Sequence, residues 1–314
     1  MSNGTSELEV SGLGIGAVER DTGFSKDTLR VWEKRYRFPT PARDRAGERV
    51  YSLPQVEKLR AMKRLMDAGH RPGKIVKLSL QELEALAGDG SMGQACSAEL
   101  QPLLDLIKAH RLEALRQNLS LTLMREGLRP FLLGTVAPLN RAVGDLWARG
   151  EFQVFEEHLY SEALQSVLHG ALNSMQRAGT PPRVLLTTLP GEQHGLGLLM
   201  AQALLAIEGC ACVSLGTQTP VQDIVLAAAS QQAQVVALSF SAAFPAAQVW
   251  GALEEIRRRL PGDVAVWVGG SNAALAKRTS AEITLISALD AIPQAVTAWR
   301  AATKRNSGVS STSP

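Results

Sequence analysis

The chain has 314 residues, 45% of them hydrophobic, which is enough for two or three folded domains and excludes an intrinsically disordered protein. Its apolar runs are shorter than the roughly 18 residues that cross a membrane, and its three cysteines make no disulfide framework, so we expect a cytoplasmic protein without a secretion signal. Residues 1–80 carry a net charge of +6 (16 Lys and Arg against 10 Asp and Glu) and the remaining 234 residues −3, which favours an anionic partner for the N-terminal part alone.

Residues 11–86 form the first predicted domain, after a start at residues 1–10 that we expect to be disordered. An apolar helix should end near Asp21, Gly23 allows a tight turn, and Ser25 stands where a second helix needs its N-cap. A helix, a short glycine turn and a second helix are the parts of a helix-turn-helix, whose second helix enters the major groove of DNA.

The second predicted helix and the segment after it expose basic side chains. Leu29 and Trp32 fall on the apolar side of this helix, which Pro39 and Pro41 bring to an end. The side chains left for solvent or phosphate are Lys26, Arg30, Lys34 and Arg35. Arg43, Arg45 and Arg49 then surround Gly47, which suits a β-wing that grips DNA phosphates. From spacing alone, a solvated basic hairpin that binds nothing remains an alternative.

The residues themselves carry a resemblance. TLRVWEKRYRFPTPAR, followed by RVYS, resembles the winged DNA-binding domain of MerR-type regulators across about residues 11–80. The resemblance implies that the recognition helix spans residues 25–36. It also implies base or phosphate contacts by Lys26, Thr28, Arg30, Arg35, Arg43, Arg45 and Arg49. Trp32 and Tyr51 are expected to pack the domain, and Tyr36 could pack or contact DNA.

A helical segment follows. Residues 87–97 are small and polar, which predicts a linker. Residues 98–180 have helical periodicity throughout, with apolar residues at three- and four-residue spacing. Four helices fit, broken near His110, Gly127 and Gly150, and a four-helix bundle would bury their apolar stripes.

From Pro181 the pattern changes to five short apolar runs: RVLLTTL, CVSLG, VVALSFS, AVWVGG and EITLIS. Stretches of helix length separate them, and this alternation predicts a Rossmann-like (flavodoxin-like) five-stranded parallel sheet over residues 181–305. Residues 306–314 are expected to be a disordered tail. The predicted fold class is thus multidomain α + α/β, with a winged helix-turn-helix, a four-helix bundle and a Rossmann-like domain.

The loop after the first predicted strand, LPGEQHGLGLLM, contains His194 among glycines. Ligands of open parallel sheets bind beyond the carboxyl ends of the strands, and glycines let a bulky planar ligand approach. Imidazole ligates transition metals, and Glu192 could accept the proton of its other nitrogen. The loop does not match the nucleotide-binding pattern GxGxxG, and no nucleophile for a general base is evident. A histidine satisfied within a loop remains the alternative.

The order of these motifs resembles the cobalamin-binding Rossmann-like domain of methionine synthase and mutases. That domain has Asp-x-His-x-x-Gly, a Ser-x-Leu segment and Gly-Gly; here Glu192 replaces the aspartate and Ser241 stands where leucine is usual. The resemblance implies that His194 is the lower axial ligand of cobalt. The remaining residues implied to contact the cofactor are Gly195, Gly197, Ser239, Gly269 and Gly270, with the glycines keeping open a slot for its nucleotide tail.

Within the bundle, Trp147 is followed by Glu157 and His158 in a Trp-x9-Glu-His pattern, which alone is typical of a core tryptophan and a surface pair. Together with the two other domains, the chain resembles the CarH/LitR family of light-sensing repressors that use 5′-deoxyadenosylcobalamin. The resemblance implies that these three side chains hold the adenosyl group. It further implies a dark tetramer on operator DNA that light dissociates, and no catalytic activity.

One position departs from that family. Its well-known light-sensing members have a histidine after the bundle tryptophan, which ligates cobalt after illumination, and here this residue is Ala148. A regulator that senses the level of cobalamin, with light incidental, therefore stays open. Two further alternatives are a corrinoid carrier for methyl transfer, which the DNA-binding head opposes, and a MerR-type regulator with an empty C-terminal domain, which His194 opposes.

Overall fold

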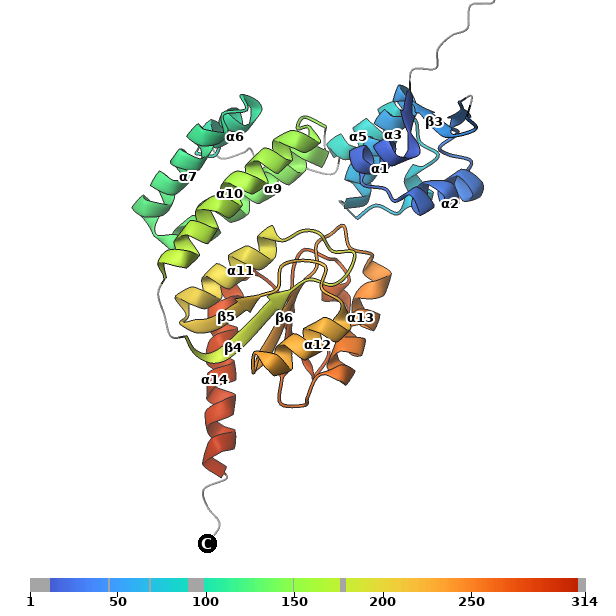
Figure 1. Cartoon of the computed structure of the whole chain (residues 1–314). Coiled ribbons are helices and arrows are strands. Elements are labelled where there is room, and N and C mark those ends of the chain that lie inside the picture. Colours follow the sequence, from blue (N-terminus) through green and yellow to red (C-terminus); the bar gives the residue numbers. More distant parts are fainter. Residues whose placement is uncertain are drawn as a thin grey trace, which may run out of the picture. The chain divides into compact units, whose positions relative to one another are not determined.

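The computed structural model describes residues 12–44, 46–67, 69–89, 99–148, 150–175 and 179–309 (Figure 1). The predicted disordered start, Arg45, most of the predicted linker and the last five residues of the predicted tail lie outside these ranges. The chain divides into two compact units: the first comprises Met1–Gly93 with Asp145–Phe152, and the second comprises Gln94–Gly144 with Gln153–Pro314.

The first unit contains the predicted helix-turn-helix and wing. Its elements are β1 (Gly12–Gly14), α1 (Ile15–Thr22), α2 (Lys26–Tyr36), β2 (Ala42–Arg43), β3 (Arg49–Ser52), α3 (Leu53–Asp67), α4 (Pro72–Ile75) and α5 (Leu80–Asp89). The strands form one antiparallel sheet in the order β1-β3-β2. Gly23 turns the chain with φ 72°, and the Ser25 hydroxyl accepts the Thr28 N–H at 3.1 Å, so the predicted turn and N-cap are confirmed.

A small hydrophobic core holds this unit together. Trp32 is 6% exposed and Tyr51 is fully buried, which confirms that both pack the domain. They pack with apolar side chains of α1, α3 and α5, including Val18, Leu59 and Leu83. The core anchors one face of α2 and leaves its basic face at the surface. The strand β1 and the separate helices α3 to α5 were not predicted individually.

The helical part of the second unit confirms the predicted bundle. Its elements are α6 (Gln101–Lys108), α7 (Leu112–Glu126), α8 (Leu128–Pro130), the π-helical η1 (Phe131–Val136), α9 (Ala137–Ala148) and α10 (Val154–Ser174). The breaks fall at His110, Gly127 and Gly150 as predicted. The third helix is continuous from Leu128 through the π-helical stretch. Pro138 accounts for that stretch, because a proline lacks an N–H and its ring crowds the carbonyl four residues earlier.

The predicted parallel sheet is also confirmed. Its strands are β4 (Thr180–Thr187), β5 (Cys210–Ser214), β6 (Val235–Ser239), β7 (Ala265–Gly269) and β8 (Ile283–Ile286), in the order β5-β4-β6-β7-β8. In this order β5 lies on one side of β4, and β6, β7 and β8 follow on the other side. The carboxyl ends of β4 and β6 therefore flank the switch point at which such sheets bind ligands.

Helices cover both faces of this sheet (Figure 1). The helices α12 (Val221–Ser230) and α13 (Ala246–Arg259) pack on one face against alternate strand residues such as Val236 and Val266. The helices α11 (Leu196–Ile207) and α14 (Ile292–Val309) pack together with β4 and β5 on the other. Two 3-10 turns, η2 (Leu275–Lys277) and η3 (Leu289–Ala291), flank β8.

Two predicted boundaries were wrong by a few residues. The helix α14 continues to Val309, so that residues 306–309 are helical and do not belong to a disordered tail. Likewise α5 extends to Asp89, into the predicted linker. Adding a residue to an existing helix is much less costly than nucleating a new one, and both helices therefore continue into glycine- and serine-bearing sequence. Within the described part of the chain, no helix has the length and apolar character needed to cross a bilayer.

Candidate functional site

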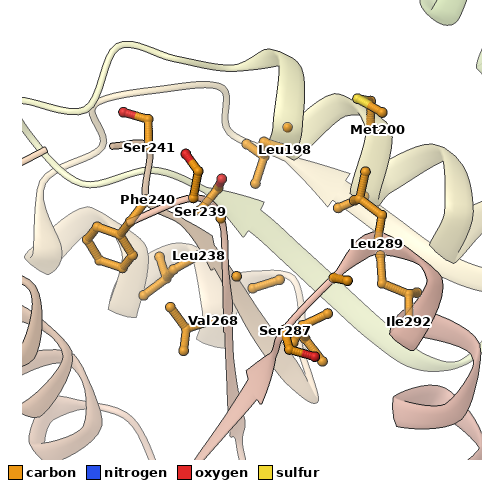
Figure 2. Close-up of a pocket in the computed structure, with 18 of the residues that line it drawn as sticks. Leu198, Met200, Leu238, Ser239, Phe240, Ser241, Val268, Ser287, Leu289 and Ile292 are labelled. Carbon is orange, nitrogen blue, oxygen red and sulfur yellow. The ribbon is translucent and has the colours of Figure 1, made fainter. Parts of the chain in front are cut away.

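A cavity of about 630 Å³ lies beyond the carboxyl ends of β4, β6, β7 and β8 (Figure 2). This volume is in the range of small-molecule sites. Helices α9, α11 and α14 and the turn η3 supply its remaining walls. The predicted site residues that line it are His194, Gly197, Ser239, Gly269 and Gly270. The structure thus brings together five residues that three separate sequence motifs contributed.

The orientation of His194 is fixed by a buried carboxylate. Glu192 is 1% exposed, and its Oε1 atom accepts hydrogen bonds from the His194 backbone N–H at 3.0 Å and from Nδ1 at 2.8 Å. The His194 side chain is itself 56% exposed. A metal would therefore have to bind at Nε2, the other ring nitrogen, because Nδ1 carries the proton shared with Glu192.

Ser241 completes the support of this carboxylate, and sequence reasoning missed its role. The other oxygen of Glu192 accepts the Ser241 backbone N–H at 2.6 Å and its hydroxyl at 2.8 Å. Burial opposes the charged form of Glu192, but the hydrogen bonds from His194 and Ser241 outweigh it, so the pKa of Glu192 lies below its ordinary value. A serine two residues after the strand-end Ser239 was the only sequence signal.

The glycines serve two different purposes. A Cβ atom on Gly197 would reach 3.6 Å from the Ser239 hydroxyl, so a side chain there would extend into the cavity as predicted. Gly270 has φ 120° and a built Cβ would collide with the Phe240 carbonyl oxygen, so a backbone constraint also requires glycine there. Gly195 does not line the cavity, and a Cβ there would approach the Thr217 methyl at 3.2 Å.

The bundle contributes side chains to the cavity that were not predicted. Asn140 and Arg141 of α9 line it together with Met200 of α11. The hydroxyl of the buried Tyr160 donates to Asn140 Oδ1, and Asn140 Nδ2 lies 3.2 Å from Met200 Sδ. This chain of contacts joins the bundle to the α/β part at the cavity wall. It depends on tertiary packing, which no local pattern encodes.

Glu157 and His158, which are predicted to hold the adenosyl group, do not line this cavity. The Glu157 carboxylate accepts from the Ser161 hydroxyl at 2.6 Å and lies 2.9 Å from His158 Nδ1. The His158 side chain is 70% exposed. Trp147 is half-buried and belongs to the first compact unit. The role predicted for these three residues therefore stays a prediction.

The donor set is unsuited to a bare metal ion. Among the residues that the structure describes, no three His, Cys, Asp or Glu side chains converge. A single imidazole does suit a metal whose other ligands come from a macrocycle, as in haem proteins. The cavity beside His194, with apolar walls and serines at its mouth, has room for part of such a ligand.

The DNA-binding residues predicted on α2 lie mostly at the surface. Lys26 forms an ion pair with Glu19 at 3.7 Å and Arg30 one with Asp27 at 3.0 Å, and all four side chains are exposed or half-buried. Exposed pairs of this kind are worth about 0–1 kcal/mol, so phosphate can replace the partner. The Thr28 hydroxyl lies 2.8 Å from Ser25 Oγ in the N-cap.

Tyr36 of α2 is less exposed than Arg43 of the wing. Tyr36 is half-buried with its ring edge toward Trp32, at 6.0 Å between centroids, and the exposed Arg35 lies over its ring. In the wing, the Arg43 guanidinium donates to the Gly47 carbonyl at 2.6 Å and is exposed.

Arg49 tethers the wing to the recognition helix. Its Nε donates to Glu33 of α2 at 2.9 Å, and this hydrogen bond raises the pKa of Arg49. Its side chain is 25% exposed, less than those of Lys26 and Arg30. Arg49 therefore positions the wing, whether or not it also reaches a phosphate.

Comparisons with known proteins identify the families to which these regions are similar. Residues 13–82 match the family described as "MerR HTH family regulatory protein", and residues 100–169 and 182–291 each match a family described as "B12 binding domain". A solved corrinoid protein, the monomethylamine corrinoid protein of Methanosarcina barkeri, shares the fold with a TM-score of 0.50 at 15% identity, over 62% of this chain and 94% of that one.

Two curated relatives cover most of the chain. The "HTH-type transcriptional repressor CarH" of Myxococcus xanthus is 31% identical over 263 residues, which is 80% of this chain and 86% of that protein. The "HTH-type transcriptional repressor CarA" of the same organism is 29% identical over 83% of this chain and 87% of its own length. The chain therefore belongs to the CarH family of MerR-type transcriptional regulators with B12-binding domains, and it is a regulator rather than an enzyme.

Proposed function

We propose that this protein is a transcriptional repressor that binds operator DNA in the dark, with 5′-deoxyadenosylcobalamin bound, and releases DNA in light. The main support for this proposal is the hydrogen bond between His194 and the buried Glu192 at the mouth of an apolar cavity. The same chain also has a winged DNA-binding domain. We assign residues 11–86 to DNA binding, 98–180 to the covering bundle and 181–305 to the cofactor.

The residues present fit a cobalamin bound with its own base displaced. His194 would ligate the cobalt through Nε2, with Glu192 and Ser241 fixing the ring. The nucleotide tail would enter the cavity past Gly197 and Ser239. When bound, the adenosyl form supplies a cobalt–carbon bond that light cleaves. We assign the adenosyl contacts to Trp147, Glu157 and His158.

The protein's part in the switch is to favour two different assemblies. A ligand shifts such an equilibrium only through different affinities for the two states, and the bundle residues that contact the adenosyl group would provide that difference. Joining weak DNA-binding heads raises avidity by about 10²–10⁴-fold without any new contact. We therefore propose a dark tetramer that occupies the operator and a lit dimer or monomer that leaves it.

Size-exclusion chromatography that reads mass and visible absorbance together tests this function. We expect the protein with adenosylcobalamin to elute as a coloured oligomer in the dark and at lower mass after illumination. Methylcobalamin in the dark serves as a control for cofactor binding without the adenosyl group. If the mass is the same in the dark and in light while the colour stays with the protein, the light-sensing proposal is wrong.

The second candidate is a sensor of cobalamin level, and Ala148 favours it. An alanine cannot ligate cobalt, so the lit state cannot gain a second histidine from this position. We expect absorbance spectra after illumination to show water or another group opposite His194, and dark re-addition of adenosylcobalamin to restore the oligomer. A spectrum of the illuminated protein that shows two histidine ligands would contradict this prediction and would make His158 the candidate for the second ligand.

Glu192→Gln tests whether the buried carboxylate orients the metal ligand. An amide keeps the size of the side chain but loses the charge, and its NH2 group cannot accept from Ser241 or His194. We expect cobalamin affinity to fall by about 10–100-fold, as outer-shell changes typically do. Titration followed by absorbance measures it, with Glu255→Gln as a matched control, because Glu255 lies on α13 at the opposite face of the sheet with its side chain 41% exposed. Unchanged affinity in Glu192→Gln would show that the pair does not support cobalt ligation.

A further inference from the structure

The floor of the cavity is formed by one cross-strand row, that is, by residues of neighbouring strands that are paired in the register. Register pairs Ser239 with Gly269 at the mouth, and two residues earlier it pairs Ala237 with Trp267. Side chains two residues apart on a strand lie on the same face, so both rows face α11 and α14. The cavity is lined by the second row and not by the next one, to which Val235 and Ala265 belong. The second row therefore closes the cavity.

Trp267 dominates this floor. It is 4% exposed and stands beside the small Ala237, to which it is paired in the register. Leu205 of α11 and Ile292 of α14 close the sides. Of the lining serines, Ser239 and Ser241 lie together at the carboxyl end of β6, whereas Ser287 lies apart from them, between Val268 and Ile292 (Figure 2).

The residues of the floor offer very few hydrogen-bond acceptors to a ligand. Among the four floor and side-wall residues just named, the indole N–H of Trp267 is the only polar side-chain group, and it donates but cannot accept. The carbonyls of β6 and β7 at this depth belong to the parallel ladder. Lining side chains that could accept, such as Ser287 and Asp290, come from the segment after β8 and not from the floor. Against the floor itself, a ligand group that donates hydrogen bonds would lose water without gaining an acceptor, whereas a flat apolar ring would not.

We propose that Trp267 selects the base at the end of the nucleotide tail, favouring dimethylbenzimidazole over a purine with an exocyclic amine. This inference rests on the proposed binding of cobalamin with its tail in the cavity. The indole sets how deep the ring can go, and its surroundings exclude the amine. The unsatisfied amine should weaken binding of the adenine-tailed analogue by about 10–100-fold.

Absorbance titration of the full-length protein in the dark tests this, with three corrinoids that carry the same upper ligand. The first has dimethylbenzimidazole, the second adenine, and the third is cobinamide, which has no tail. We expect affinity to fall in that order. Equal affinity for the first two overturns the selectivity, and cobinamide binding as tightly as the first overturns tail binding in this cavity. If no corrinoid binds, the proposed function itself fails.

Variants separate Trp267 from the rest of the fold. Trp267→Ala should lower affinity for the dimethylbenzimidazole form and reduce the discrimination against adenine, because a deeper floor admits water. Trp250→Phe is the matched control, since Trp250 lies on α13 at the opposite face of the sheet, and it should keep the full discrimination. If Trp267→Ala does not fold, Trp267→Phe replaces it. Discrimination that survives in every folded Trp267 variant contradicts the assignment.

Discussion

Replacing His194 by alanine should reduce cobalamin affinity by at least about a hundredfold, the upper end of what losing an outer-shell partner of a metal ligand costs. Among the residues that line the cavity, His194 is the only histidine. The fold should survive, because the His194 side chain is 56% exposed and Glu192 would keep its hydrogen bonds from the backbone N–H of residue 194 and from Ser241. Absorbance titration in the dark measures the loss.

Arg30→Ala is the matched control for His194→Ala. Arg30 lies in the other compact unit, at the exposed face of α2, and its partner Asp27 is also exposed. This variant should bind cobalamin normally and weaken operator binding by about 1–3 kcal/mol if Arg30 contacts a base. If both variants lost both properties to the same extent, misfolding would explain the result and the assignment of two separate sites would be unsupported.

Operator binding should be tight only in the dark with adenosylcobalamin, and it should weaken by about 10²–10⁴-fold on illumination as the heads separate. The dark complex should also be strongly salt-sensitive, because each phosphate contact releases counterions and adds about −0.9 to the slope of log K against log salt. Fluorescence anisotropy with labelled operator DNA measures both effects. The first unit supplies the charge for such contacts, with a net +6 over residues 1–80.

Two comparisons make this result decisive. Protein without cofactor should bind like the illuminated protein, and His194→Ala should not respond to light. A cofactor-free protein that binds the operator as tightly as the dark holoprotein would refute regulation by cobalamin. If the dark holoprotein bound operator DNA tightly and light did not change this binding, the protein would instead be a sensor of the cobalamin level.

The sequence predicted the architecture well where local pattern and tertiary structure agree. The five strands were recognisable because a parallel sheet covered on both faces needs continuous apolar runs such as VVALS. Gly23 and Ser25 were recognisable because turns and caps have strict residue requirements. The π-helical stretch before Pro138 was not predicted, since a proline in a helix can be accommodated in several ways.

The site was predictable only in part. The Glu192–His194 hydrogen bond was expected because the two residues are close in sequence, and the structure contains it. Ser241, Asn140 and Trp267 were missed, because their contribution comes from strand register and helix packing. Their positions became meaningful only once distant parts of the chain were brought to one cavity.

The most direct test of the central claim identifies the nitrogen that ligates cobalt. EPR spectra of the bound cofactor, reduced to paramagnetic Co(II), show splitting by the axial nitrogen, and protein labelled with ¹⁵N can be compared with unlabelled protein. Ligation by His194 predicts that each cobalt line splits in three with unlabelled protein and in two with labelled protein. Three-fold splitting in both samples would show that the cofactor keeps its own base, and would contradict the account.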